Sequence, residues 1–291
     1  MSIKYLFAIS ATVLATTLPI VFTTPASAAA KVNTNANKTP KDVVGYDVSW
    51  PQCSSKLPSD PAFVVVGVNG GRADEANPCL QKQLDWAKAA PGTPDQPGLQ
   101  LYLNTANPGV SSESWPTNNL DPLSKDVENP YMICDGSDSQ ACAWQYGYNK
   151  AFISDKSFFA SAAGLAGIAP EADKYIWWLD VEYDNSWQLG SEDAQSRNRA
   201  VLEGMADYLI RQDVKTVGIY STIAQWTDIT GGKNKISASS SLNAMPDWRP
   251  SGTLPIAKYN CSKAQPLTND GRVALTQYVV GGLDRNYSCP R

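Results

Sequence analysis

The chain has 291 residues, of which 43% are hydrophobic and 18% are charged, so it is long enough for one large domain or two small ones. Its net charge of −4 and its pI near 5.0 argue against binding to nucleic acid. It contains no histidine, which excludes a Ser-His-Asp triad, a Cys-His pair and a zinc helix of the H-E-x-x-H type. Any acid–base chemistry must therefore use carboxyl groups or tyrosines.

The N-terminal segment has the pattern of a secretory signal peptide. Lys4 precedes an apolar run from Tyr5 to Val21, and small residues follow up to Ala28. We therefore expect a signal peptide over residues 1–28, a polar disordered linker over 29–41 and one domain over 42–291. No later stretch is long and apolar enough to span a bilayer. These patterns predict a secreted protein, extracellular or attached to the cell wall, with no membrane contact after cleavage.

Six cysteines in an exported chain indicate three disulfides. Spacing alone does not determine the pairing, but chain order favours Cys53–Cys79, Cys134–Cys142 and Cys261–Cys289. There is no C-x-x-C pair of the kind that holds zinc. We expect neither a metal nor an organic cofactor.

Strand-like and helix-like segments alternate after the linker. The expected strands are residues 43–49, 62–69, 99–104, 175–182 and 216–220, and the expected helices are 79–90, 141–166 and 194–212. Three further short segments, 245–248, 254–260 and 273–279, are strand-like with little helix between them. Five strand–helix units followed by three strands predict an α/β fold, an irregular TIM-like barrel of eight strands. The alternative is an open doubly wound sheet, but no G-x-G-x-x-G motif follows the first strand.

Residues 105–140 form a long stretch rich in Pro, Asn, Asp and Ser. It follows the third predicted strand, so in a barrel we expect it to lie over the carboxyl-terminal face, where long loops are often functional. Trp115 and Tyr131 in this stretch either stack on sugars or hold the loop to the rim.

Two acids, Asp180 and Glu182, end the most hydrophobic predicted strand. Because side chains alternate along a strand, these two face the same way, and at the end of a barrel strand that direction is into the mouth. Trp177 and Trp178 provide apolar surroundings that raise a carboxyl pKa, as a general acid requires at neutral pH.

Two more acids lie at strand ends. Asp47 closes the first predicted strand, and Asp284 follows the last one beside two glycines. The first and eighth strands adjoin in a closed barrel, so all four acids are expected to converge. A turn or capping role for Asp47 and a surface turn for Asp284 are the alternatives.

Four segments resemble, in order, motifs of glycoside hydrolase family 25, the secreted lysozymes. They are G-Y-D-V-S-W-P-Q at 45–52, W-L-D-V-E at 178–182, V-G-I-Y-S at 217–221 and L-T-Q-Y-V-V-G-G-L-D-R-N at 275–286. A still closer likeness is to the less characterised, secreted glycoside-hydrolase-like barrels of Gram-positive bacteria. The resemblance implies a barrel of five strand–helix units plus three strands.

The resemblance also implies roles for the four acids. Glu182 matches the general acid, Asp180 the acid that orients the 2-acetamido group of the substrate, and Asp47 and Asp284 match further acids lining the cleft. The implied reaction is hydrolysis of the β-1,4 bond after N-acetylmuramic acid in peptidoglycan. We expect the protein to be a monomer. Two positions depart from the family pattern: L-Y-L-N-T at 101–105 lacks the third-strand histidine, and Thr276 stands in place of a tryptophan.

Two other functions stay open from the sequence: a glycan-binding or wall-associated protein that keeps the barrel without turnover, and a glycosidase for another wall polysaccharide. Six polar or aromatic residues near predicted strand ends are expected to line the cleft and bind sugars, with a packing role as the alternative for each. They are Gln52, Tyr102, Asn104, Tyr220, Trp248 and Gln277.

Overall fold

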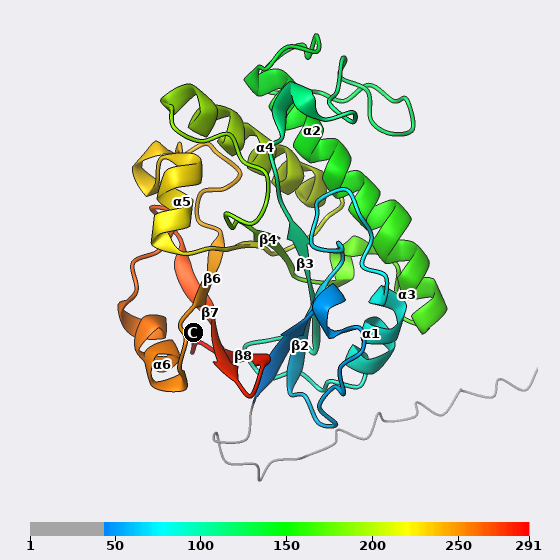
Figure 1. The fold of residues 1–291 in the computed structure, drawn as a ribbon, viewed down its shortest axis with the longest axis vertical. Helices are drawn as coiled ribbons and strands as arrows, with labels where there is room; N and C mark the ends of the chain where they lie inside the picture. Colours follow the sequence, from blue (N-terminus) through cyan, green and yellow to red (C-terminus); the bar gives the residue numbers. More distant parts are fainter. Residues whose placement is uncertain (1–43, 291) are drawn as a thin grey trace, which may run out of the picture. The chain divides into compact units, whose positions relative to one another are not determined.

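In the computed structural model, which describes residues 44–290, eight strands close into a barrel (Figure 1). The strands are β1 (Gly45–Val48), β2 (Phe63–Gly67), β3 (Leu99–Asn104), β4 (Trp177–Asp180), β5 (Val217–Tyr220), β6 (Pro246–Pro250), β7 (Arg272–Val280) and β8 (Leu283–Ser288). Strands β1 to β7 pair in parallel, each with the next, and β8 runs antiparallel between β7 and β1. The predicted irregular TIM-like barrel is confirmed. The predicted signal peptide and linker lie outside the described residues.

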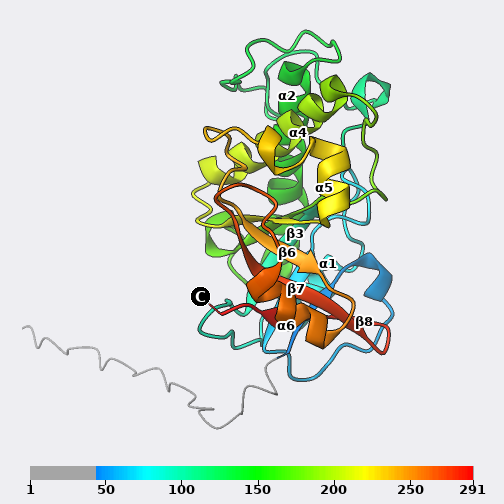
Figure 2. The same cartoon turned by 90° about the vertical axis from the view of Figure 1, so that its left-hand side faces the viewer.

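Helices surround the barrel, as Figures 1 and 2 show from two directions. They are α1 (Leu80–Ala87), α2 (Gln140–Ile153), α3 (Ala160–Ala166), α4 (Glu192–Arg211), α5 (Ile223–Thr230) and α6 (Leu254–Lys263). A π-helical segment, Ser154–Phe159, joins α2 to α3. Between β1 and β2 the structure has a 3-10 turn, Trp50–Gln52, and no α-helix.

The prediction for the last third of the chain was wrong in one strand. Residues 254–260 belong to helix α6, and the eighth strand is β8 instead. Thr253 has an extended backbone at the helix start, and Pro255 lies in the first turn. Proline is favoured there because its missing N–H would have no helical partner.

Large aromatic side chains fill the inside of the barrel. Phe63, Trp178 and Trp248 lie there, all almost fully buried. Glycine makes room for them, since a Cβ atom on Gly218 would lie 2.3 Å from the Trp178 ring. The indole Nε1 of Trp178 donates to Gln100 Oε1 at 2.8 Å, which satisfies its polar atom inside the barrel. The interior is therefore a packed core.

The later part of the long loop after β3 packs on α2, away from the barrel mouth (Figure 1), whereas residues 106–114 line a cleft with residues 184–186 at the carboxyl-terminal end of the strands. Trp115 is buried against Tyr146 of α2, with ring centroids 5.5 Å apart, and the hydroxyl of Tyr131 donates to Glu203 of α4. Both aromatics therefore hold the loop to the helices. The helices themselves approach closely, because a Cβ on Gly147 would lie 2.0 Å from a backbone oxygen of α4.

The cysteines form the three expected pairs, Cys53–Cys79, Cys134–Cys142 and Cys261–Cys289. The second pair ties the long loop to α2, and the third ties the segment after β8 to α6. Within residues 44–290, no helix combines the length and the apolar character needed to cross a membrane.

Candidate active site

The four predicted acids line one pocket of about 180 Å³ at the carboxyl-terminal end of the parallel strands. Asp47 lies on β1, Asp180 ends β4, and Glu182 comes two residues later. Asp284 lies within β8, just after the turn at Gly281 and Gly282, and not beyond the last strand as the sequence suggested. Because β8 runs back from the end of β7, its first residues stay at the mouth of the barrel.

Antiparallel pairing of β8 builds the surroundings of Asp47. Asn286 is paired with Gly45 on one side and with Gln277 of β7 on the other. The Asn286 side chain donates to Asp47 Oδ2 at 2.7 Å, and Gln277 Nε2 donates to Asp47 Oδ1 at 2.9 Å. Burial and the charge of Asp284 raise the pKa of Asp47 to about 8, against the opposing effect of these two hydrogen bonds.

Two aromatic donors fix the orientation of those amides. Tyr220 donates its hydroxyl to Gln277 Oε1 at 2.8 Å, and Trp248 Nε1 donates to Asn286 Oδ1 at 2.8 Å. Each amide oxygen is thereby occupied, so each amide N–H₂ group faces Asp47. The network leaves Asp47 held by donors from two strands, in one conformation.

Asp180 is buried and held from behind the pocket. Its backbone oxygen accepts from Thr105 Oγ1 at 2.5 Å and from Thr105 N at 3.2 Å. The Asn104 amide, oriented so that both of its polar atoms are satisfied, donates to Asp180 Oδ2 at 3.0 Å and accepts from Gly71 N at 3.2 Å. Asp180 Oδ1 is buried with no hydrogen-bond donor among the described residues.

Asp180 and Glu182 titrate as a pair. Burial raises the pKa of Asp180 well above its usual range, and the charges of Glu182 and Asp47 raise it further. Burial, followed by the charge of Asp184, also raises the pKa of Glu182, while hydrogen bonds with Asp180 and Gln225 oppose that rise. A proton shared between the two carboxyl groups would also satisfy the otherwise unpaired Asp180 Oδ1. Ionising both carboxyl groups is therefore disfavoured, since each charge raises the cost of the other.

Five of the six residues expected to line the cleft do so: Gln52, Tyr102, Tyr220, Trp248 and Gln277. The sixth, Asn104, does not line this pocket but supports Asp180 from behind. The Trp248 ring lies 4.5 Å from the Tyr220 ring and 6.1 Å from the Tyr102 ring, centroid to centroid. Tyr102 and Trp248 thus join the pocket wall to the aromatic core of the barrel.

Three residues of the site were missed from the sequence. Asn286 orients Asp47, Ser49 lines the pocket, and the charge of Asp184 acts on Glu182. Asn286 stands two residues after Asp284, a spacing that places both on one side of β8 and that could have identified it. Across residues 44–290, no three His, Cys, Asp or Glu side chains are grouped as metal ligands.

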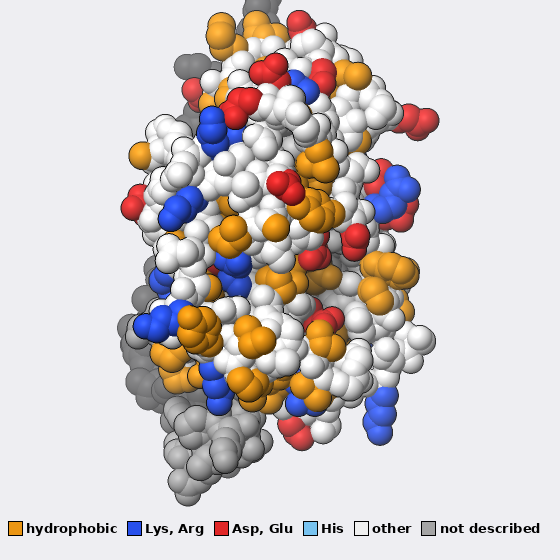
Figure 3. Space-filling view, turned by 60° about the vertical axis from the view of Figure 1, so that its left-hand side comes forward, with side chains coloured by type: hydrophobic (Ala, Val, Ile, Leu, Met, Phe, Trp, Pro, Cys, Tyr) orange, Lys and Arg blue, Asp and Glu red, His pale blue; other side chains and the backbone are white. Residues whose placement is uncertain are grey.

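One face of the molecule has a hollow that contains acidic side chains and is bordered by hydrophobic ones (Figure 3). Among the exposed large hydrophobic residues are Trp50, directly after β1, Tyr183, after β4, and Ile223, after β5. All three follow the carboxyl ends of their strands, the end at which the acids lie. The flat rings of Trp50 and Tyr183 are suited to stacking on sugar rings.

The chain matches no protein-family model and no curated protein sequence. Solved structures that resemble it include a muramidase of Trichobolus zukalii, with 16% identity, a TM-score of 0.45, and 86% of this chain and 94% of that chain covered. A lysozyme of Streptomyces coelicolor has 17% identity and a TM-score of 0.48, covering 85% and 92%. A family GH25 lysozyme of Aspergillus fumigatus has 13% identity and a TM-score of 0.47, covering 85% and 94%.

Proposed function

We propose that this protein is a secreted glycoside hydrolase of the lysozyme type, which cleaves β-1,4 bonds of peptidoglycan. The observation that carries the proposal is the convergence of Asp47, Asp180, Glu182 and Asp284 in one pocket at the carboxyl ends of barrel strands. The pKa of each is raised, first of all by burial. A raised pKa favours the protonated form of a carboxyl group, which general acid catalysis requires. The motifs that resemble glycoside hydrolase family 25 supply the same residues.

Glu182 acts as the general acid in this proposal. It is half-buried and lines the pocket, whereas Asp180 lies deeper at the strand end. Asp180 ends β4, Glu182 follows two residues later, and both line the same pocket, which does not suit a nucleophile and an acid on opposite sides of a glycosidic bond. It suits a reaction in which the acetamido oxygen of the substrate attacks the anomeric carbon.

The proton balance of that reaction follows from the carboxyl pair. As substrate enters, Asp180 accepts a hydrogen bond from the acetamido N–H, and the shared proton passes to Glu182. Glu182 gives this proton to the leaving glycosidic oxygen while the acetamido oxygen bonds to the anomeric carbon. Water then attacks that carbon and gives a proton to Glu182, while the bond from the acetamido oxygen to the anomeric carbon breaks. The acetamido group and the starting state are thereby restored. Asp180 stabilises the positive charge on the acetamido-derived ring between the two steps.

The test is the release of reducing ends from purified peptidoglycan, identified by mass spectrometry. We expect muramic-acid reducing ends from the wild-type protein. Glu182→Gln should lower the rate by at least about 10²-fold, since general acid catalysis typically contributes ~10²–10⁴-fold. It should leave binding to the glycan intact, because glutamine keeps the shape of the side chain.

Glu171→Gln is the matched control, because Glu171 is exposed and precedes β4 at the opposite end of the barrel. It should leave the rate unchanged. If the wild-type protein binds peptidoglycan in a saturable way but releases no product, the protein binds glycan and does not hydrolyse it. If products appear only from another wall polysaccharide, that polysaccharide is the substrate and peptidoglycan is not. Equal rates for wild type and Glu182→Gln would remove Glu182 from the chemistry.

A further inference from the structure

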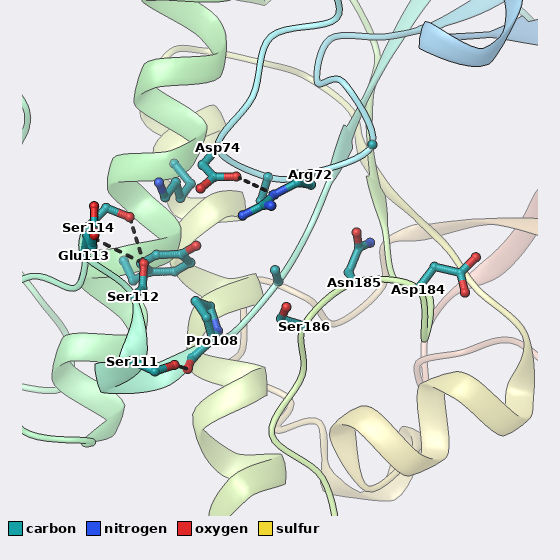
Figure 4. A pocket seen from close by; sticks show the side chains of 15 residues that line it. Arg72, Asp74, Pro108, Ser111, Ser112, Glu113, Ser114, Asp184, Asn185 and Ser186 are labelled. Atoms are coloured by element: carbon teal, nitrogen blue, oxygen red, sulfur yellow. Dashed lines mark hydrogen bonds and ion pairs between the residues drawn. The ribbon is translucent and has the colours of Figure 1, made fainter.

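A second and larger cleft opens beside the acid pocket. It has a volume of about 510 Å³, which falls within the ~300–1,000 Å³ typical of small-molecule sites, whereas the acid pocket has about 180 Å³. Figure 4 shows Arg72 and Asp74 along one side and Ser112 and Ser114 along another, with Asn185 and Ser186 across from them. These residues come from the loops after β2, β3 and β4, the same end of the barrel that holds the acids.

Lys150 of α2 lines this cleft and has no partner of opposite charge. Its side chain is 5% exposed, yet its ammonium group makes no ion pair or hydrogen bond with any residue of the described range 44–290. The ammonium lies 5.2 Å from the centre of the Tyr146 ring, which also lines the cleft. The side chain is largely buried while its ammonium faces the open cleft, where an anionic group of a ligand can pair with it.

The carboxylates nearest to Lys150 are engaged by another cation. Asp74 attracts the ammonium, but Arg72 pairs with both Asp74 and Glu75, at 3.4 Å each, so neither carboxylate is paired with Lys150. Glu113 and Asp184 also line the cleft, but both are exposed to solvent. The buried end of the cleft thus carries the ammonium, and its exposed rim carries carboxylates. A zwitterionic ligand would match this arrangement, with its carboxylate inside the cleft near Lys150 and its amine outside near the exposed carboxylates.

The cleft and the acid pocket share a wall. Asn104 donates to Asp180 on the pocket side and accepts from the backbone of Gly71, which lines the cleft. On the β4 side, Asp184 lines the cleft, and its charge raises the pKa of Glu182, which stands two residues earlier in the chain. A polymer with its reacting bond at the acids would therefore carry substituents of the same sugar toward this cleft.

We propose that the second cleft binds the peptide attached to the glycan, with Lys150 holding one of its carboxylates. The inference rests on the proposed function and names the substrate more closely: peptidoglycan that carries its stem peptides, in preference to bare glycan strands. Peptidoglycan is a polysaccharide whose muramic-acid units bear short peptides with free carboxyl and amino groups, which is the charge pattern of the cleft. The serines around the cleft supply neutral hydrogen bonds to peptide groups.

The test compares two substrates, purified glycan strands with their stem peptides and the same strands after enzymatic removal of the peptides. Dissociation constants are measured by calorimetry and rates by reducing-end release. We expect the wild-type protein to prefer the peptide-bearing strands by about tenfold or more, as is typical of a hydrogen bond to a charged group. Lys150→Met keeps the length of the side chain but removes the charge, so this preference should fall to near one.

Lys215→Met is the matched control, because Lys215 is exposed and precedes β5 at the other end of the barrel. Lys215→Met should keep the preference for peptide-bearing strands. Arg72→Gln provides a second variant at an exposed position of the cleft, in case Lys150→Met does not fold, and it should weaken the preference. Equal affinity of wild type for both substrates, or a full preference in Lys150→Met, would overturn the inference even if both are cleaved. If the protein prefers to bind peptide-bearing strands but cleaves none of them, peptide binding in the second cleft is supported and the proposed hydrolysis is contradicted.

Discussion

Two buried aspartates of the barrel differ in what surrounds them. Asp47 on β1 and Asp247 on β6 are both buried, and burial raises the pKa of the first to about 8 and of the second to about 7. Asp47 lines the pocket with three other acids. Asp247 lies on the opposite side of β6 from Trp248, which fills the barrel, and its Oδ2 accepts from Leu267 N at 2.8 Å.

The difference shows that a raised pKa alone does not mark an active site. Asp247 has the charge of Arg249 to lower its pKa, and its Oδ1 has no hydrogen-bond partner among the described residues. It lies against the loop after α6 and holds that loop to the barrel. Asp47 has like charge nearby and open space in front of it. The direction in which the strand presents each side chain, inward or outward, separates chemistry from structural support.

The largest expected difference is in activity. We expect Asp47→Asn to lower the rate of peptidoglycan hydrolysis by about 10²-fold, because it changes the charge balance around the Asp180 and Glu182 pair. Asp247→Asn should change the rate by less than about twofold. Initial rates of reducing-end release by the two folded variants measure this. Similar losses in both would mean that Asp247 is not a purely structural residue.

The next effect concerns the support of Asp47. We expect Asn286→Ala to reduce the free energy of unfolding by about 3 kcal/mol, since it leaves both Asp47 Oδ2 and Trp248 Nε1 without a partner and each such loss costs ~1–3 kcal/mol. Urea unfolding with the disulfides intact measures it. Asn234→Ala, at an exposed position with no side-chain hydrogen bond among the described residues, should stay within about 0.5 kcal/mol. A cost as small as that for Asn286→Ala would show that the network does not support the fold.

The smallest effect is a pH dependence of stability that both aspartates share. Their folded-state pKa values of about 8 and about 7 exceed the ordinary 3.8, so the folded protein binds protons more tightly than the unfolded chain. The stability from this source is fully present below about pH 4 and is lost as pH rises through 7 to 8. We expect Asp247→Asn to remove about 2 kcal/mol of the fall between pH 5 and pH 8. Urea unfolding across that range measures the slope, and an unchanged slope would mean that Asp247 is ionised throughout.

The candidate site was largely predictable from the sequence because strand period and strand ends are local properties. Asp180 and Glu182 follow an apolar run, and Asp47 stands in a motif at the end of another. Their alternation along a strand predicts the face that each one presents. Asn104 and Asn286 were harder to interpret, since an amide that supports a carboxylate from another strand has no local signal.

The fold prediction was wrong where local patterns were ambiguous. Residues 254–260 are a short, partly apolar segment without a clear period, and Pro255 in the first turn marks the helix start. The helix α5 was missed although Thr222 and Gln225 form a capping box at its start. Short helices have too few turns for a clear period, so capping residues are the better guide there.

The sequence by itself determined the alternation of strands and helices, the strand ends at which the acids lie and the absence of any histidine chemistry. Only the tertiary structure decided which way β8 runs, and hence that Asn286 and Gln277 meet at Asp47. It also decided that the loop after β3 packs on α2 and leaves a cleft lined by Lys150. The physical reason is one of range. Backbone period and capping depend on neighbours within one or two turns, whereas closing a barrel and pairing buried polar groups depend on residues more than two hundred positions apart, such as Asp47 and Asn286.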